Sequence, residues 1–487
     1  MPSKTKILWV GDDLRLDTGF GKINRNLLSR LCADERFEVV HQGWYYNRSN
    51  PAFNKPFPGN LKIFHTTLNK NDVCLKDDEF GQHSLYELIS KERPQVVVTV
   101  ADTFTLSHLP AIKERLPFTW VGYVPIDGEP LPTESYRQDT PFKWWDVLGK
   151  MDFIVCYGEF GQKTIKERHP EGNVNKISIG VDTDVFCPSG CGQEMRASMG
   201  LESDATLVGL FSRNQPRKGI PSALQAVSLL GDNRTYCPDC GSLVRGHYSR
   251  CPVWLRKGMP NQKICGGKNV LAQEHLDLNK LRLYLHMASH DVGWPLRDLV
   301  AEKGLAGKRV VMFNESLRIG CGCSEDKLNA LYNACDISVL PSSGEGFGMT
   351  ALESMAAGTP VVCSGYSGLT DFVSEEWGSL IPSYHNHAFT NEPLTNIRRF
   401  NIDEAMLVMG LERFILNDSD RFRSNWGIDR DIDVGREYRS RLSESAREKA
   451  ISLSWDNVYS QWESLLVAAT EKSLALKQSP WAHLIKA

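Results

Sequence analysis

The stretch from Asp336 to Phe372 constrains the fold of this 487-residue chain more than any other part. It reads as a short apolar strand at Ile337–Leu340, a glycine-rich loop, a helix over about Thr350–Ala357 and a second strand from Pro360. Such a unit is typical of open parallel sheets, which bind ligands at the carboxyl ends of their strands. The loop therefore predicts a ligand site, and the helix N-terminus behind it favours an anion.

The residues of this loop suggest what the ligand contains. Gly346 and Gly348 would let the backbone approach a phosphate closely, and the carboxylates of Glu345 and Glu353 can accept hydrogen bonds from sugar hydroxyls. A nucleotide-sugar carries a diphosphate, a ribose and a sugar, and would account for all of these features. A simpler interpretation stays open, in which Thr350 to Glu353 is a capping box and the glycine-proline segment after it ends the helix.

The spacing of the two glutamates adds a family resemblance. Seven residues separate Glu345 from Glu353 within EGFGMTALESMAAGTPVV, a pattern that closely resembles the signature of family 4 retaining glycosyltransferases of the GT-B fold. The resemblance implies an α/β protein with two Rossmann-like, doubly wound domains facing a cleft. It also implies that Glu345 contacts the donor sugar, that Glu353 contacts the ribose hydroxyls, and that the intervening residues line the donor site: Gly346, Phe347, Gly348, Met349 and Thr350.

Composition limits the alternatives. With 41% hydrophobic and 24% charged residues, the chain is globular and long enough for two or three domains. A net charge of −3 provides no overall attraction to nucleic acid or membranes. No apolar run is long enough to cross a bilayer, and MPSKTKILWVG reads as a charged start before a strand rather than a signal peptide. Thirteen cysteines, an odd number, favour a reducing compartment, so we expect a cytoplasmic protein without a membrane span.

The N-terminal part predicts a first strand at Ile7–Val10 and a helix over about Lys22–Leu31. The loop between them contains Gly19 and Gly21, and a glycine-rich turn at this point is the usual phosphate or sugar cradle of a doubly wound domain, although it is also compatible with a simple tight turn. The resemblance implies that this loop approaches the donor diphosphate and the acceptor. The polar and aromatic stretch from Phe37 to Asp78 is interpreted as an elaborated loop near the acceptor.

A candidate catalytic residue follows the next strands. Strands are expected at Gln95–Val100 and Phe118–Val124, and the second ends in PIDGEPLP, which contains Asp127 and Glu129. Family members have a His or an Asp here beside the transferred sugar or the acceptor, so the resemblance makes Asp127 the candidate. The alternative is that Asp127 only begins a turn.

The domain boundaries come from the resemblance. The phrase NKISIGVDTDVFCP resembles the hinge of the family, which predicts an N-terminal domain at 1–185, a C-terminal nucleotide-sugar domain at 186–460 and a tail at 461–487 that returns to the first domain. After an expected strand at Thr206–Phe211, Arg213 and Lys218 have the spacing of the family residues that hold the donor diphosphate. Two cations can neutralise the charge that develops on the leaving diphosphate, so no catalytic metal is expected.

An insert at residues 235–268 interrupts the second domain, because it has neither helical nor strand periodicity of any length. Cys237-Pro-Asp-Cys240 forms a knuckle, and Cys251 and Cys265 complete four thiolates for a structural, zinc-ribbon-like site, with His247 as a possible substitute ligand. The insert is also basic and aromatic, so it could bind phosphate backbones, although its charges could equally serve solubility. These residues are Arg245, Arg250, Arg256, Lys257, Lys263, Lys268, Tyr236, Tyr248 and Trp254.

Three further motifs carry less weight. Asn314 and Glu315 follow an expected strand at Arg309–Phe313, and the resemblance places the nucleotide base near them. Cys321 and Cys323 form an isolated Cys-x-Cys that is more often incidental. Asp429, Asp431 and Asp433 imitate a metal-binding Asp-x-Asp, but no strand precedes them and we interpret the region after Ile381 as surface structure.

Together these patterns predict a retaining hexosyl or pentosyl transferase that moves a sugar from a UDP-, GDP- or ADP-sugar to an acceptor hydroxyl. The acceptor expected from the family is a saccharide or small molecule. The basic insert raises an alternative, the hydroxymethylated pyrimidines of viral DNA. A rival of another class is a non-catalytic nucleotide or nucleic-acid binding protein on the same scaffold. We expect Glu345→Ala to abolish transfer and to leave folding intact.

Overall fold

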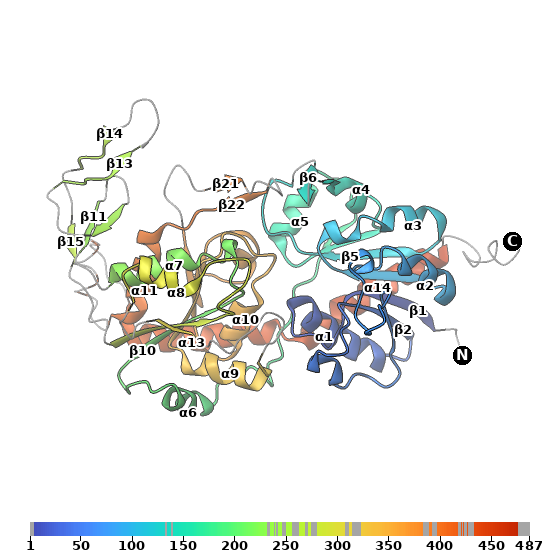
Figure 1. Ribbon diagram of the computed structural model, residues 1–487, viewed down its shortest axis with the longest axis horizontal. Helices are drawn as coiled ribbons and strands as arrows, with labels where there is room; N and C mark the ends of the chain where they lie inside the picture. The colour runs from blue at the N-terminus through green and yellow to red at the C-terminus, as the bar shows by residue number, and fades with distance from the viewer. Residues whose placement is uncertain are drawn as a thin grey trace, which may run out of the picture.

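The computed structural model describes residues 4–131, 134–137, 140–230, 280–306, 311–313, 323–382, 389–391, 397–416 and 433–475, with the short pieces 234–237, 239, 242–245, 250–255, 263–267 and 271–273 and the single residues Asp420, Phe422 and Trp426. Two α/β lobes lie side by side, one blue to cyan and the other green to orange (Figure 1).

The N lobe is built on a seven-stranded, all-parallel sheet with the order β3-β2-β1-β4-β5-β8-β9. Its strands are β1 (Thr5–Asp12), β2 (Phe37–Trp44), β3 (Lys62–His65), β4 (Val96–Val100), β5 (Thr119–Val124), β8 (Phe153–Cys156) and β9 (Val174–Lys176). Its helices are α1 (Gly19–Ala33), α2 (Ser84–Glu92), α3 (Leu109–Arg115), α4 (Trp144–Leu148) and α5 (Glu159–Lys166), with 3₁₀ turns at Pro51–Asn54, Lys76–Asp78 and Thr103–Leu106 and a hairpin of β6 (Glu134–Arg137) and β7 (Thr140–Lys143).

The C lobe repeats the arrangement with a six-stranded, all-parallel sheet of order β17-β16-β10-β18-β19-β20. Its strands are β10 (Thr206–Phe211), β16 (Leu281–His286), β17 (Val311–Phe313), β18 (Ile337–Leu340), β19 (Val361–Ser364) and β20 (Gly378–Ile381). Its helices are α6 (Cys191–Ser198), α7 (Ile220–Leu230), α8 (Leu296–Glu302), α9 (Glu325–Ala334), α10 (Met349–Ala356), α11 (Glu404–Ile415) and α13 (Gly435–Ser452), with 3₁₀ turns at Pro216–Lys218 and Ser367–Asp371 and a hairpin of β21 (Phe389–Asn391) and β22 (Arg398–Phe400).

Helices cover both faces of each sheet, which is why the central strands are near-continuous apolar runs. All five residues of β4 are buried, for example. One hydrophobic cluster runs through both lobes, from Trp9 and Leu27 in the N lobe to Leu331 and Leu352 in the C lobe. The lobes therefore share apolar packing as well as two chain crossings.

The crossings run side by side. Val181, on the way out of the N lobe, forms a parallel bridge with Ser454, on the way back, and Trp455 N–H donates to the Val181 carbonyl at 3.2 Å. The returning helix α14 (Trp455–Ala475) then packs on the N-lobe sheet, where the ring of Trp462 lies 5.5 Å from Trp9 and 4.9 Å from Tyr123. Figure 1 shows α14 in red among the N-lobe elements.

The expected α/β fold with two parallel, Rossmann-like sheets is confirmed, but two local expectations are wrong. Phe37–Trp44 is not loop: it is strand β2, paired with β1 over eight residues. Its apolar pattern is interrupted by His41 and Gln42, both fully buried because each has a hydrogen-bonding contact inside the fold, His41 Nδ1 with the Trp9 carbonyl and Gln42 Nε2 with Ser84. Real loop structure in this stretch lies around β3.

The region after Ile381 is likewise more than surface structure. Helix α11 buries Leu407, Leu411 and Phe414 in the C-lobe core. Helix α13 is mixed in charge, but buries one stripe that includes Tyr438 and Leu442. Asp433 precedes α13 and pairs with Arg441 at 3.0 Å, whereas Asp429 and Asp431 lie outside the described residues.

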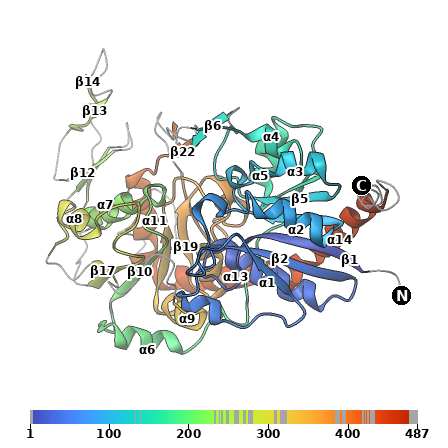
Figure 2. The same cartoon turned by 45° about the vertical axis from the view of Figure 1, so that its right-hand side comes forward.

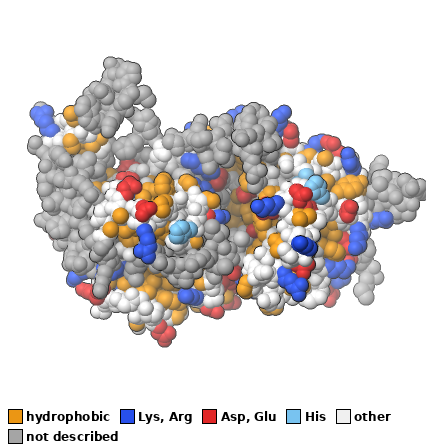
Figure 3. Space-filling model, viewed as in Figure 1, with side chains coloured by type: hydrophobic (Ala, Val, Ile, Leu, Met, Phe, Trp, Pro, Cys, Tyr) orange, Lys and Arg blue, Asp and Glu red, His pale blue; other side chains and the backbone are white. Residues whose placement is uncertain are grey.

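Among the helices that the structure describes, none is both long and apolar enough to span a membrane. On the described part of the face in Figure 3, acidic and basic side chains are interspersed.

Candidate functional site

The glycine-rich loop lies at the carboxyl edge of the C-lobe sheet, between β18 and α10. Gly348 is the N-cap of α10, with φ at 105°, and no side chain caps the helix. A positive φ at this point requires glycine or strains any other residue. The capping-box interpretation is therefore wrong, because Thr350 lies inside the helix and Glu353 is used elsewhere.

Glu345 is held by two cations from the loop after β10. Lys218 Nζ lies 2.5 Å from its Oε1 and Arg217 Nη1 lies 3.0 Å from its Oε2. Burial alone would raise the pKa of Glu345, but Lys218 and Arg217 outweigh it and lower that pKa to about 2. Glu345 is therefore a carboxylate at neutral pH and can only accept hydrogen bonds.

The two cations differ in their response to burial. Burial lowers the pKa of Lys218 to about 8, since Arg217 opposes its charge and Glu345 restores only part of it. Burial also disfavours the Arg217 charge, but the Glu345 carboxylate raises the pKa of Arg217 above its usual value. Arg217 also donates to the Gly344 carbonyl at 2.7 Å, so it holds the backbone of the glycine-rich loop as well as pairing with the Glu345 carboxylate.

Glu353 connects the two lobes. Its Oε1 lies 2.6 Å from Lys22 Nζ of α1, and its Oε2 accepts a hydrogen bond of 2.9 Å from the Tyr332 hydroxyl. Burial would lower the pKa of Lys22, but pairing with Glu353 outweighs burial and raises it. A second pair, Arg25 to Glu325 at 3.1 Å, supports the same contact. Helices α1, α9 and α10 therefore meet through charge at the lobe boundary.

The N-terminus of α1 faces this site, and Gly19 and Gly21, which were expected in the loop before the helix, lie in its first turn. A Cβ on Gly19 would lie 3.7 Å from the Met349 sulfur across the boundary, so Gly19 borders the C-lobe loop. A Cβ on Gly21 would lie 2.5 Å from the Leu16 carbonyl, so this glycine is required by the loop's own turn. Thr18 caps α1 by accepting from Gly21 N–H at 2.9 Å.

Asp127 is also at the lobe boundary. Its Oδ2 lies 2.9 Å from Arg399 Nη1, which also donates to the Asp127 carbonyl at 3.1 Å. A Cβ on Gly346 would come within 2.7 Å of Pro125, and Gly344 likewise leaves no room beside Asp127. The glycines of the C-lobe loop therefore allow the loop after β5 to approach, in addition to any ligand.

Two predicted site residues have their side chains in other contacts. Arg213 makes a two-point contact with Asp291, at 3.0 and 2.8 Å, and is half exposed rather than beside Glu345. Phe347 is buried, and its ring stacks on Phe372 at 4.6 Å. Arg217 was not predicted from the sequence, because the family spacing pointed to Arg213, although the adjacent Arg217-Lys218 pair is visible in the sequence. Lys22 was not predicted either.

The cysteine cluster is partly described. Cys237, Cys251 and Cys265 lie close together, with their sulfur atoms all within 4.8 Å of one another. Cys240, His247, Cys321, Asn314 and Glu315 lie outside the described residues. Cys323 Sγ lies 3.7 Å from His286 Nε2.

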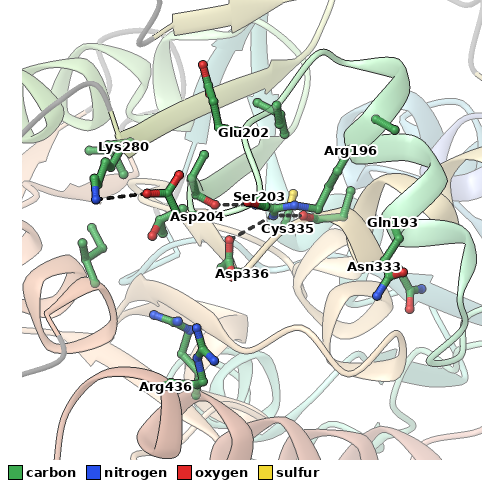
Figure 4. A pocket seen from close by; sticks show the side chains of 18 of the residues that line it. Gln193, Arg196, Glu202, Ser203, Asp204, Lys280, Asn333, Cys335, Asp336 and Arg436 are labelled. Atoms are coloured by element: carbon green, nitrogen blue, oxygen red, sulfur yellow. Dashed lines mark hydrogen bonds and ion pairs between the residues drawn. The ribbon is translucent and has the colours of Figure 1, made fainter.

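A hollow lies at the amino edge of the C-lobe sheet, opposite the edge that carries the glycine-rich loop. This pocket of about 1150 Å³ is lined at the starts of β10 and β16, and contains the ion pairs Arg196–Asp336 and Lys280–Asp204 (Figure 4). Because open α/β sheets bind ligands at the carboxyl ends of their strands, this amino-edge pocket is not the candidate site.

Comparison with known proteins shows which families and folds the chain resembles. The model of glycosyl transferases group 1 matches residues 313–393, which contain both Glu345 and Glu353. D-inositol 3-phosphate glycosyltransferases of Stackebrandtia nassauensis and Streptomyces avermitilis are 30% and 26% identical over 257 and 260 residues, in each case 51% of this chain and 48% and 46% of the relative. The chain thus spans about half the length of the curated relatives it matches.

Solved structures match over nearly the whole chain. Sucrose-phosphate synthase from Thermosynechococcus elongatus superposes with a TM-score of 0.65 at 16% identity, over 96% of this chain and 99% of that one. Anabaena HepE in complex with UDP and glucose gives 0.56 at 14% identity, over 95% and 100%. The chain therefore has the GT-B fold, and the segment that carries Glu345 and Glu353 matches the glycosyl transferases group 1.

Proposed function

We propose that this chain is a retaining glycosyltransferase that moves a sugar from a nucleotide-sugar to an acceptor hydroxyl. The observation that carries the proposal is the Glu345 carboxylate, held between Lys218 and Arg217 at the carboxyl edge of the C-lobe sheet and next to the N-lobe loop of Asp127. The cations Lys218 and Arg217 suit a phosphate, the Glu345 carboxylate suits sugar hydroxyls, and the loop of Asp127 suits an incoming acceptor.

In the proposed reaction the acceptor oxygen bonds to the anomeric carbon while the bond from that carbon to the donor phosphate breaks. The electron pair stays on the diphosphate, whose oxygen takes the acceptor proton on the same face, so configuration is retained without a protein nucleophile. Lys218 and Arg217 would turn from Glu345 toward the diphosphate and stabilise the charge that develops there. Arg213 stays a candidate for an outer contact, and transfer itself needs no metal.

Each carboxylate has a proposed ligand. Glu345 would accept hydrogen bonds from the donor sugar, because its low pKa excludes a role as a proton donor. Glu353 would accept hydrogen bonds from the ribose hydroxyls, either after Lys22 moves away or while Lys22 stays paired with the same carboxylate. Asp127 would orient the acceptor or sugar, with Gly19, Gly21, Gly346, Gly348, Met349 and Thr350 shaping the approach.

The donor tested first is UDP-glucose, because the HepE structures are complexes with UDP, glucose and UDP-glucose. GDP- and ADP-glucose are the comparison donors. The acceptor panel contains an inositol phosphate, after the named relatives, together with saccharides and DNA that carries hydroxymethylated pyrimidines. We further propose a cytoplasmic location, which the cysteine content favours.

The experiment is a transfer assay read by mass spectrometry, with the anomeric configuration of the product read by NMR. Transfer with retention supports the proposal, and the acceptor that gains the sugar selects between small molecule and DNA. Inversion would contradict the mechanism. Nucleotide binding by calorimetry, without hydrolysis or transfer from any donor, would instead favour the non-catalytic binding protein.

A further inference from the structure

The insert between α7 and β16 forms a separate small unit. Its described strands are β11 (Arg234–Tyr236), β12 (Leu243–Arg245) and β15 (Leu271–Gln273) in one antiparallel sheet, and β13 (Trp254–Leu255) with β14 (Lys263–Ile264) in a hairpin. In Figures 1 and 2 these strands project from the end of the C lobe that is away from the N lobe. The unit therefore lies away from the boundary between the lobes.

The strands of this unit are short, at two or three residues each. A two-stranded hairpin is only marginally stable on its own in water. A bound metal ion would add stability to so small a unit.

The sulfur atoms of three cysteines converge inside it. Cys237 and Cys251 are each 1% exposed, Cys265 is partly buried, and the sulfurs of Cys237 and Cys265 are 3.8 Å apart. A disulfide would place sulfurs about 2.05 Å apart. In a tetrahedral site with Zn–S bonds of about 2.3 Å, neighbouring sulfurs are about 3.8 Å apart.

The backbone around the sulfurs is shaped for this convergence. Cys251 N–H donates to the Gly267 carbonyl at 3.2 Å, and Gly266 N–H donates back to the Cys251 carbonyl at 3.1 Å. Gly266 has φ at 63°, which favours glycine. A Cβ on Gly267 would lie only 2.9 Å from the Cys237 sulfur, so glycine keeps this side of the cluster open.

We propose that this unit is a zinc module in which the thiolates of Cys237, Cys251 and Cys265 bind one structural Zn²⁺. Thiolate ligands select zinc over hard cations such as Mg²⁺ or Ca²⁺. The metal would stabilise the unit, because binding free energy becomes folding free energy in small units of this kind. Cys240, three residues after Cys237 in the sequence, and His247 are the alternatives for the fourth ligand.

The test measures metal in the purified full-length chain by inductively coupled plasma mass spectrometry. We expect one zinc per chain, a fall of at least fivefold in Cys237→Ser, Cys251→Ser and Cys265→Ser, and no change in Cys187→Ser, a matched cysteine outside the insert. Cobalt substitution should give the intense charge-transfer and visible bands of tetrahedral thiolate coordination. Cys240→Ser and His247→Ala then identify the fourth ligand, and metal loss in either one supports the site.

Limited proteolysis keeps the proposal testable where a variant fails to fold. A chelator added to the wild-type chain should make residues 235–268 cleavable and leave the fragments of both lobes intact. Absence of zinc, together with absence of the cobalt bands, would overturn the proposal. So would equal metal loss in Cys187→Ser, or an insert whose cleavage does not respond to the chelator.

Discussion

The carboxyl edges of the two sheets have the same architecture and opposite electrostatics. In the C lobe, Arg217 and Lys218 surround the buried carboxylate of Glu345. In the N lobe, β1 ends in two buried acids, Asp12 and Asp13, and only the second is paired with an arginine in the described residues. In these described contacts, cations outnumber carboxylates at the C-lobe edge and carboxylates outnumber cations at the N-lobe edge.

Two buried carboxyls make the contrast quantitative. Burial raises the pKa of Asp12 to about 6, and the hydrogen bond from Thr18 at 2.5 Å offsets only part of that effect. The pKa of Glu345 is instead lowered to about 2 by its cations. Burial decides the state of Asp12, whereas the two cations override burial at Glu345, so the same chemical group destabilises one edge and stabilises the other.

The largest expected effect is that of Glu345→Gln. We expect a loss of transfer of about a thousandfold, since an amide cannot balance two buried cations, and a loss of roughly 3 kcal/mol of folding free energy. The expectation from sequence is that Glu345→Ala leaves folding intact, so the stability measurement decides between the two predictions. Initial rates and urea denaturation measure the two effects.

A double variant separates stability from chemistry. Glu345→Gln/Lys218→Met removes one unpaired cation, so it should regain part of the stability but none of the activity. An active Glu345→Gln enzyme would remove Glu345 from the proposed donor site.

The next effect distinguishes Arg217 from Arg213. Arg217→Ala should lower kcat by about a hundredfold, the order seen when one preorganised charge-stabilising donor is removed. Arg213→Ala is the matched control and should lower kcat by less than about tenfold, because Arg213 is half exposed and paired with Asp291. The reverse ranking would show that the family spacing, rather than the contact with Glu345, identifies the diphosphate ligand.

Asp12→Asn should act in the opposite direction to Glu345→Gln. The folded pKa of about 6 lies above the ordinary value of 3.8, so the chain loses stability as pH rises from 3.8 to about 6, and the loss stays constant above pH 6. A neutral amide that still accepts from Thr18 should stabilise the chain by about 1–3 kcal/mol at pH 8. Thermal unfolding at pH 8 and pH 4 measures this, and a gain that does not shrink at pH 4 would contradict the assigned cause.

The smallest effect tests the contact between the edges. Lys22→Met removes the pairing of α1 with Glu353, and we expect the KM for the donor to change by roughly threefold to tenfold with little change in kcat, since Tyr332 still holds Glu353. Small-angle X-ray scattering should show a larger radius of gyration without donor. Arg48→Met is the matched control, because its pair with Asp72 lies within the N lobe and is exposed. Unchanged kinetics and scattering would mean that this pair has no part in lobe closure.

Much of the fold could be predicted because its central strands carry their own signal. The strands at Ile7, Gln95, Thr206 and Ile337 were all recognisable as continuous apolar runs, since both of their faces are buried. Strand β2 was not, because His41 and Gln42 interrupt its run. Helix α13 was hidden by its mixed charge, since only one narrow stripe of it is buried.

The candidate site also contains some residues whose position follows from the sequence pattern and others whose position does not. Glu345, Gly348 and Lys218 lie in loops between recognisable elements, so their proximity to the sheet edge followed from topology. Arg217 and Arg213 are four residues apart in one loop, and no periodic pattern indicates which of them turns toward Glu345. The direction of a loop side chain depends on the partners that the fold provides.

The sequence by itself determined the parallel α/β class, the glycine-rich loop and the cysteine cluster, because each depends on neighbours along the chain. Only the tertiary structure decided that Lys22 meets Glu353, 331 residues away, and that Asp127 meets Arg399, 272 residues away. Such pairs depend on how two independently patterned sheets pack against each other. That packing depends on the core of both lobes together, so no local motif predicts it.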